Sequence, residues 1–164
     1  AFYVVDTPAE QVNIDALYDK GFITLTTHTG KSGYYFVDDH LACTVEDDYH
    51  FLTRRRVIDK AYVLANQALT NFILDTIPVT GEGKMQATYA KALEAEVERV
   101  IVQEMTAKGE ISADVTVAND TGVECTIDTT NNVVQDSTIN GRIRVRPHGY
   151  ARFLEFTIGF NTGQ

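Results

Sequence analysis

The sequence predicts an α+β fold, in a sandwich-like α/β arrangement where a mixed β-sheet packs against a long two-helix hairpin and a C-terminal β-hairpin ends the chain. Apolar residues recur with helical spacing through most of residues 49–109, which is typical of amphipathic helices. Apolar and polar residues alternate over residues 142–146 and again over 154–160, which is the period of a half-buried strand. A chain of 164 residues is long enough for one domain with a sizeable core.

The first 40 residues are predicted to contain short strands around one helix. Residues 2–5 are apolar and strand-like. Thr7, Pro8 and Glu10 form the pattern of a helix start, and the helix is expected to continue to Asp19. A strand is then predicted to begin at residues 22–25, and a glycine-containing turn at 30–33 connects it to a further strand at 34–37.

Two long helices are predicted in the middle of the chain. The first begins near Tyr49 and the second near Gln86, with Pro78 and Gly81–Gly83 as the break between them. Gly109 stands where a C-terminal cap belongs. The apolar stripes comprise Val57, Ala61, Leu64, Ala65, Ala68, Leu69, Phe72 and Ile73 on the first helix and Tyr89, Leu93, Val97, Val100, Ile101 and Met105 on the second.

The last third of the chain is predicted to be all β. Residues 111–118 and 123–128 read as strands on either side of the turn sequence at 119–122. The strand at 142–146 places three arginines on one face. A terminal strand over residues 152–160 has Leu154, Phe156, Ile158 and Phe160 on one face.

Charge is distributed unevenly along the chain. The formal net charge is −9, with 14 basic and 23 acidic side chains, which argues against a nucleic-acid-binding or anionic-membrane-binding surface over the whole molecule. No apolar run approaches the ~20 residues of a membrane span. Residues 1–141 carry −12 and residues 142–164 carry +3. We therefore expect one domain over residues 1–164 with a basic β arm at residues 142–164.

The arginine row has two interpretations that the sequence leaves open. It is either a solvent-facing row on an antiparallel edge or an electrostatic contact with an acidic neighbour, including another copy of the chain. A sheet edge at the chain end is also a template for strand addition by another chain. The predicted inter-subunit residues are Arg142, Arg144, Arg146, Arg152, Leu154, Phe156, Ile158 and Phe160.

No catalytic arrangement is found, so the sequence predicts a non-enzyme without cofactor or metal. The rival interpretation is a metal-dependent hydrolase built on the loop that contains Asp38, Asp39, His40, Asp47 and His50. A solvated acidic loop is the favoured interpretation, because metal sites need convergent geometry.

Further motifs have unremarkable interpretations. Thr29-Gly30-Lys31-Ser32 resembles a P-loop but lacks its first glycine, so a hairpin turn is expected. Cys43 and Cys125 are interpreted as buried thiols, although one disulfide is also compatible with the composition. The pairing of Cys43 with His40 or His50 as a thiolate pair is the less favoured alternative.

Five segments, taken in their order along the chain, resemble the C-terminal region of contractile phage tail sheath proteins. The similarity is greatest to sheath-like proteins of prophages in Bacteroides-type bacteria, and it spans nearly the whole chain. The segments are Leu17-Tyr18-Asp19-Lys20-Gly21-Phe22-Ile23, Gly30–His40, Arg55–Ala61, Lys108–Ser112 and Arg142–Ala151 before the terminal strand.

The resemblance implies a structural protein whose inner sheath domain belongs to a longer polypeptide. In that family, stacked hexameric rings form a helical sheath around a tail tube, and strands exchanged between neighbours hold the mesh through contraction. The expected partners are other copies of the chain, the tail tube protein and the baseplate. The expected location is the virion tail, assembled in the bacterial host cytoplasm. A sheath component of a related contractile injection system is the alternative within the same class.

Overall fold

The chain forms two compact units, Ala1–Ala42 with Gly149–Gln164, and Cys43–His148. The computed structural model contains helices and antiparallel strand pairs, which confirms the α+β class. The boundary at residue 149 falls inside the predicted basic arm. The structure describes residues 3–4, 7–8, 13–44, 46–151 and 155–157.

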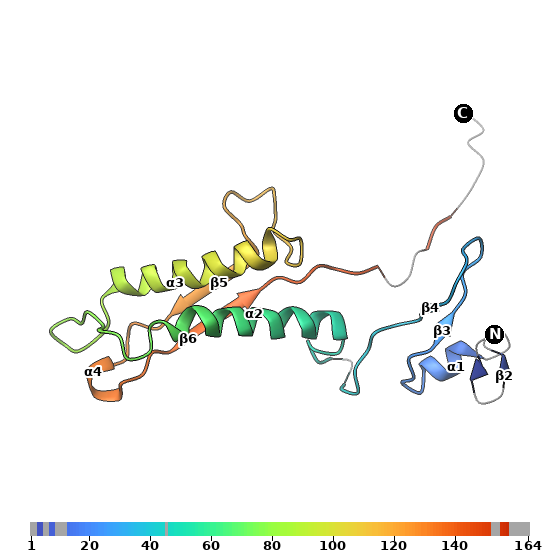
Figure 1. Cartoon of the computed structure of the whole chain (residues 1–164), viewed down its shortest axis with the longest axis horizontal. Helices are drawn as coiled ribbons and strands as arrows, with labels where there is room; N and C mark the ends of the chain where they lie inside the picture. Colours follow the sequence, from blue (N-terminus) through green and yellow to red (C-terminus); the bar gives the residue numbers. More distant parts are fainter. Residues whose placement is uncertain (1–2, 5–6, 9–12, 45, 152–154, 158–164) are drawn as a thin grey trace. The chain divides into compact units, whose positions relative to one another are not determined.

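The Cys43–His148 unit is built on a helix hairpin. Helix α2 spans Leu52–Thr70 and helix α3 spans Ala87–Ile101, and the two run side by side in opposite directions (Figure 1). A π-helical segment, Val102–Thr106, continues α3. The hairpin predicted from the apolar stripes is therefore confirmed. Both helices begin one to three residues later than predicted.

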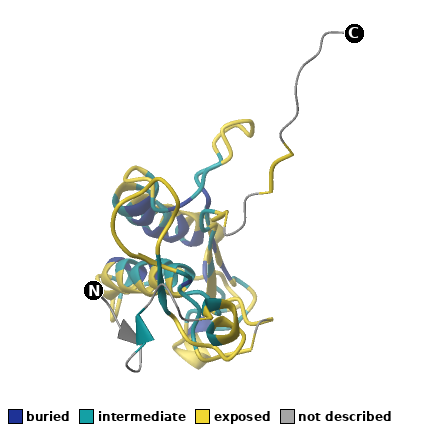
Figure 2. Cartoon of the chain, turned by 90° about the vertical axis from the view of Figure 1, so that its right-hand side faces the viewer, coloured by how far each residue is buried: buried dark blue, intermediate teal, exposed yellow. Residues whose placement is uncertain are grey.

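Small and large apolar side chains make the contact between the helices. The buried residues of α2 are all alanines, at positions 61, 65 and 68, and this spacing places them on one helix face that α3 can approach closely. Helix α3 contributes the larger side chains, including Leu93, Val97 and Ile101, which are at most 2% exposed. Figure 2 shows the buried residues gathered in this unit, where the helices meet the strands.

Gly109 ends the second helix as the sequence predicts. Its φ of +71° lies in the left-handed region. The following residue, Glu110, donates its main-chain N–H to the carbonyl of Met105 at 2.9 Å, which is the bond that closes a Schellman-type end. Lys60 of α2 holds the carboxylate of Glu110 at 2.6 Å and so ties this end to the other helix.

Strands β5 (Val123–Ile127) and β6 (Gly141–Val145) form an antiparallel pair that packs against α3. Cys125 and Ile127 are buried, and Ile143 packs against the same core. The short helix α4, Val133–Asp136, lies in the connection between the strands.

The predicted strand over residues 111–118 is wrong. Only Ile111 forms an isolated bridge, with Pro147, and the residues after it make turns. The physical reason is local competition from carboxylates: Asp114 accepts the N–H of Thr116 at 2.9 Å, and Asp120 accepts the N–H of Asp114 at 2.7 Å. The partner of β5 is therefore β6.

The described residues of the other unit form two short strand pairs and a short helix. Strands β1 (Tyr3–Val4) and β2 (Thr7–Pro8) pair, as do β3 (Leu25–Thr26) and β4 (Tyr35–Phe36), which confirms the predicted hairpin across the Gly30–Gly33 turn. Helix α1 spans Ile14–Tyr18.

The helix start predicted at Thr7 is wrong, because Thr7 and Pro8 are paired with Val4 and Tyr3 in a strand. Asn13 caps α1 instead, and its side chain accepts the N–H of Ala16 at 3.1 Å. Among the described residues of this unit, Asp38 alone is buried.

The sheets differ in detail from the predicted single mixed sheet. Within the described part of the chain, the strands form three separate two-stranded antiparallel sheets. The predicted terminal strand falls mostly outside the described residues, and its described portion, residues 155–157, carries no strand assignment.

Candidate functional site

The β5–β6 pair has one face toward the helices and one face toward solvent. Register pairs Glu124 with Arg144 and Thr126 with Arg142, and these four side chains are exposed. The intervening residues point to the core. The strict alternation predicted for residues 142–146 is therefore confirmed, because the three arginines are exposed and Ile143 and Val145 are half-buried.

The hydrogen bonds at the ends of the pair define which main-chain groups point outward. Asp128 donates its N–H to the carbonyl of Asn140 at 2.8 Å, and Arg146 donates to the carbonyl of Gly122 at 2.8 Å. In an antiparallel ladder, bonded pairs alternate with non-bonded pairs. The main-chain groups of residues 123, 125 and 127 on β5, and of 141, 143 and 145 on β6, therefore point to the two outer edges.

Side chains of α3 close the outer edge of β5. The Oε1 atom of Glu98 accepts the N–H of Cys125 at 2.8 Å, and the Oε1 atom of Glu94 accepts the N–H of Ile127 at 2.8 Å. The other oxygen of Glu94 accepts a hydrogen bond from Lys91 at 2.6 Å. Two outward donors of the β5 edge, the N–H groups of Cys125 and Ile127, are thus satisfied by carboxylates instead of by a strand.

The environment of these carboxylates shifts two pKa values. Burial acts to raise the pKa of Glu94, but hydrogen bonds from Lys91 and the Ile127 N–H, with the Lys91 charge, lower it overall. Burial, reinforced by the negative charges of Glu98 and Glu94, raises the pKa of the Cys125 thiol to about 11. Cys125 is a free and buried thiol, as the sequence predicts, and its raised pKa disfavours the thiolate form.

The outer edge of β6 is open. No hydrogen bond within the described ranges satisfies the outward main-chain groups of Gly141, Ile143 and Val145. Past the strand, Ser112 donates its N–H to the carbonyl of Arg146 at 2.9 Å, but this carbonyl faces the β5 side, as the Arg146 N–H does, so the bond does not cover the outer edge. Such an edge is a template for strand pairing.

A largely apolar pocket of about 820 Å³ lies where β6 meets the end of α2. Leu74, in its lining, is fully exposed and has a φ of +64°, a left-handed conformation that disfavours a branched side chain. Ile73 and Val134 are also more than 60% exposed. Its lining includes Phe72, Ile73, Leu74, Ile139, Gly141 and Ile143.

The arginines of the predicted row have different surroundings. Arg144 lies 3.6 Å from the carboxylate of Glu124, with both side chains more than 60% exposed. For Arg142, the described residues provide no ion pair. Both line a second, polar pocket on the solvent face of the strands.

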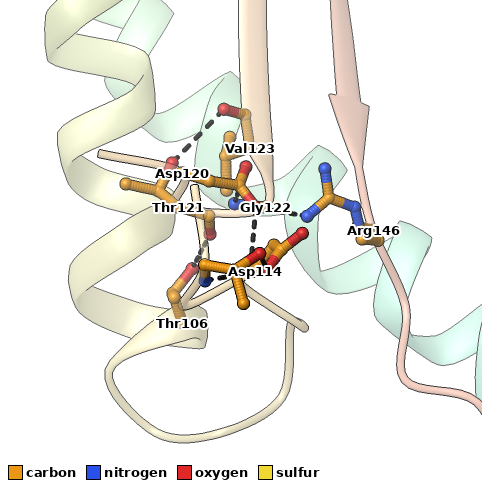
Figure 3. A network of polar contacts seen from close by, with 8 residues as sticks. Thr106, Asp114, Asp120, Thr121, Gly122, Val123 and Arg146 are labelled. Carbon is orange, nitrogen blue, oxygen red and sulfur yellow. Dashed lines mark hydrogen bonds and ion pairs between the residues drawn. The ribbon is translucent and has the colours of Figure 1, made fainter. Parts of the chain in front are cut away.

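Arg146 belongs to a network within the chain (Figure 3). It forms an ion pair with Asp120, which also accepts the N–H groups of Asp114 and Gly122. The hydrogen bond from Arg146, followed by these main-chain bonds, outweighs burial and lowers the pKa of Asp120. Thr106 and Thr121 join the loop to the π-helical segment through a 2.9 Å bond.

The remaining predicted inter-subunit residues lie near the chain end. Phe156 is 80% exposed, and Arg152, Leu154, Ile158 and Phe160 lie outside the described residues.

The acidic loop of the hydrolase interpretation does not assemble three ligands. Among the residues that the structure describes, no group of three His, Cys, Asp or Glu side chains could hold a metal ion. Asp38 and His40 approach to 3.5 Å in one unit, whereas Asp47 and His50 belong to the other. Cys43 is exposed, so its predicted burial is wrong, and its Sγ atom lies 3.8 Å from Nδ1 of His50.

Sequence reasoning missed the two carboxylates on the β5 edge. The available signal was the presence of Glu94 and Glu98 directly after the buried positions Leu93 and Val97 on the stripe of α3. A helix-only interpretation treats them as solvated, because it contains no information about a neighbouring strand edge.

No helix in the described ranges is long and apolar enough to cross a membrane.

Comparison with known proteins identifies a family. No curated protein matches the chain. The family described as DUF2586, C-terminal domain, matches residues 48–164, which covers the whole strand pair, both long helices and the chain end. The chain therefore belongs to the DUF2586 family and contains its C-terminal domain.

Proposed function

We propose that this chain is a structural subunit of a contractile phage tail sheath, which polymerises around a tail tube by exchanging strands between copies. The observation that carries the proposal is an open strand edge beside an apolar pocket, on a chain whose last residues have an alternating apolar sequence. The resemblance of the sequence to tail sheath proteins supplies the biological setting.

The acceptor is the outer edge of β6. Its outward main-chain groups recur at every second residue, which is the spacing that an added strand requires. The pocket adjoining Gly141 and Ile143 offers apolar surface to alternate side chains of that strand. Main-chain bonds would provide affinity and the pocket would provide selectivity.

The donor is the segment from Arg152 to Phe160. Its apolar residues at 154, 156, 158 and 160 share one face, as a strand over an apolar surface needs. The segment lies beyond Gly149, in a different compact unit from β6. Phe156 leaves 80% of its surface exposed, which is unfavourable for a large aromatic side chain without a partner.

The occupant we propose for the β6 edge is the donor segment of a second copy. A contact between two different surfaces of identical chains is heterologous, so repetition gives rings or helical assemblies. Stacked hexameric rings are one assembly of this kind. The added strand would also enlarge the β5–β6 sheet toward the predicted sandwich-like, mixed sheet, with the terminal hairpin formed between copies.

The proposed partners follow from this role. They are other copies of the chain, the tail tube protein and the baseplate, in a virion tail assembled in the host cytoplasm. The same contacts would serve the sheath of a related contractile injection system. Arg142 and Arg144 remain the cations available for an acidic neighbour, because Arg146 is bound to Asp120.

The test is assembly of the protein in its host, examined by electron microscopy. Deletion of residues 152–164 should abolish sheaths. The substitution Phe156→Asp, on the apolar face of the donor segment, should strongly reduce them. The matched control Thr157→Asp changes the opposite face of the same segment and should leave assembly intact. Normal contractile sheaths from the deletion would contradict the proposal.

A further inference from the structure

The two edges of the β5–β6 pair are treated differently by the rest of the chain. The described residues leave the β6 edge without partners, whereas Glu94 and Glu98 satisfy two outward donors of β5 at 2.8 Å. Both edges belong to one two-stranded sheet, so the same strand chemistry would otherwise make both equally receptive.

The spacing of the two glutamates matches the spacing of a strand edge. Residues four apart on a helix lie about 6 Å apart along its axis. Outward N–H groups on a strand recur every second residue, or about 6.8 Å. Glu94 and Glu98 on α3 are thereby in phase with Ile127 and Cys125 on β5.

Burial shows that the interaction is more than a surface contact. Glu94 is 6% exposed, and a buried carboxylate is unfavourable unless its charge and oxygens are satisfied. Lys91 and the Ile127 N–H satisfy one oxygen each. The carboxylate occupies the position at which a carbonyl of an added strand would accept the same N–H.

We propose that Glu94 and Glu98 block the β5 edge and so confine strand addition to β6. The β5–β6 pair of each copy then has one acceptor edge, which matches the one donor segment proposed per chain. Two open edges would let each copy accept two strands, and the result would be branched association instead of a closed ring. The identity of the added strand rests on the proposed function, but the block itself does not.

Amide hydrogen exchange of the whole chain, followed by NMR, tests the block directly. In Glu94→Ala/Glu98→Ala, the amides of Cys125 and Ile127 should exchange at least about tenfold faster than in the wild type, because each loses its acceptor. In Glu94→Gln/Glu98→Gln, an amide oxygen replaces the carboxylate oxygen, and the exchange of both amides should stay near that of the wild type. Unchanged protection in the alanine variant would overturn the proposal.

Two internal controls separate loss of the block from unfolding. The amides of Glu124 and Thr126 bond to β6 and should remain protected in every variant. If the amides of Glu124 and Thr126 also lose protection in the double alanine variant, the strand pair itself has opened, and the single alanine variants then test the block. Glu98→Ala should release only the Cys125 amide, and release of both amides by either single variant would overturn the one-to-one assignment.

A peptide with the sequence of residues 152–160 distinguishes the two proposals. Added in excess to the wild-type chain, it should perturb the amides of Gly141, Ile143 and Val145 and leave the β5 edge unchanged. In the alanine variant it should also perturb Cys125 and Ile127. If the wild-type β6 amides do not respond, strand addition at β6 fails, while the exchange measurement still decides whether the glutamates close β5.

Discussion

The two compact units of the chain differ in how far they satisfy their own apolar residues. Among the described residues of the Cys43–His148 unit, thirteen hydrophobic residues are buried, and most of them come from the helices and β5. In the described part of the other unit, Asp38 alone is buried, while Phe22 and Phe36 leave 57% and 76% of their surfaces exposed. The difference teaches that the apolar burial that stabilises the fold lies in the helix-and-strand unit, whereas the described part of the other unit leaves large apolar side chains exposed.

The largest expected effect is truncation in the core of the helix hairpin. Ile101→Ala should lower the free energy of unfolding by about 2–5 kcal/mol, because Ile101 is fully buried against both helices and the strands. Phe36→Ala in the other unit should change it by less than about 0.5 kcal/mol. Urea unfolding followed by helical circular dichroism measures both. An equal loss in the two variants would remove the distinction between the units.

A matched glycine pair sharpens the comparison. Gly122 has a φ of +72°, and a Cβ there would lie 2.2 Å from the carbonyl oxygen of Ser112. Gly122→Ala should therefore destabilise the chain by about 1–3 kcal/mol. Gly149 has open space around it, so Gly149→Ala should be nearly neutral. Thermal unfolding measures the stability of both variants. If Gly122→Ala unfolds at the same temperature as the wild type, the loop of residues 112–122 does not constrain β5.

The network in Figure 3 predicts a pH dependence of the stronger unit. Hydrogen bonding from Arg146 holds the pKa of Asp120 below its ordinary value of 3.8. The folded state therefore gains stability from ionised Asp120 above that value and loses it as the pH falls through the lowered pKa. The wild type should exceed Asp120→Asn in free energy of unfolding by the largest amount at pH 6, and this difference should shrink below pH 3.8. A difference that is constant from pH 6 to about pH 2.5 would contradict this assignment.

The smallest expected effect concerns the exposed arginines. Arg142→Glu/Arg144→Glu should leave the free energy of unfolding within about 1 kcal/mol, because both side chains are exposed and at most loosely paired. It should weaken assembly of copies more at low salt than at high salt, since salt screens exposed charges. Light scattering across a salt series measures this. If the variant assembles with the same salt dependence as the wild type, Arg142 and Arg144 face solvent and do not contact an acidic neighbour.

The regular elements with long periodic patterns were predictable from sequence. The stripes of α2 and α3 and the alternation in β6 each repeat over several turns or residues, so local spacing determines which face is buried. Thr7 illustrates the limit, because a capping-box pattern six residues from the chain start was outweighed by pairing with Val4. The spacing of residue types along the sequence does not show whether a helix cap or a strand pair is the more stable.

The candidate site was predictable only in part. Alternation identified β6 and its arginine face, but the sequence could not show that Arg146 would be held by Asp120, 26 residues away. It also could not show that Glu94 and Glu98 reach a strand about 30 residues later. These contacts depend on tertiary packing of α3 beside β5, which sequence separation does not specify.

The most direct test of the central claim is strand addition between two copies at β6. An isotope-labelled chain ending at residue 151 is mixed with the unlabelled whole chain, and amide exchange of the labelled chain is followed by NMR. The amides of Gly141, Ile143 and Val145 should become protected, and a Phe156→Asp donor should protect them much less. If the whole chain leaves these three amides as unprotected as before mixing, copies do not exchange their terminal strand at this edge.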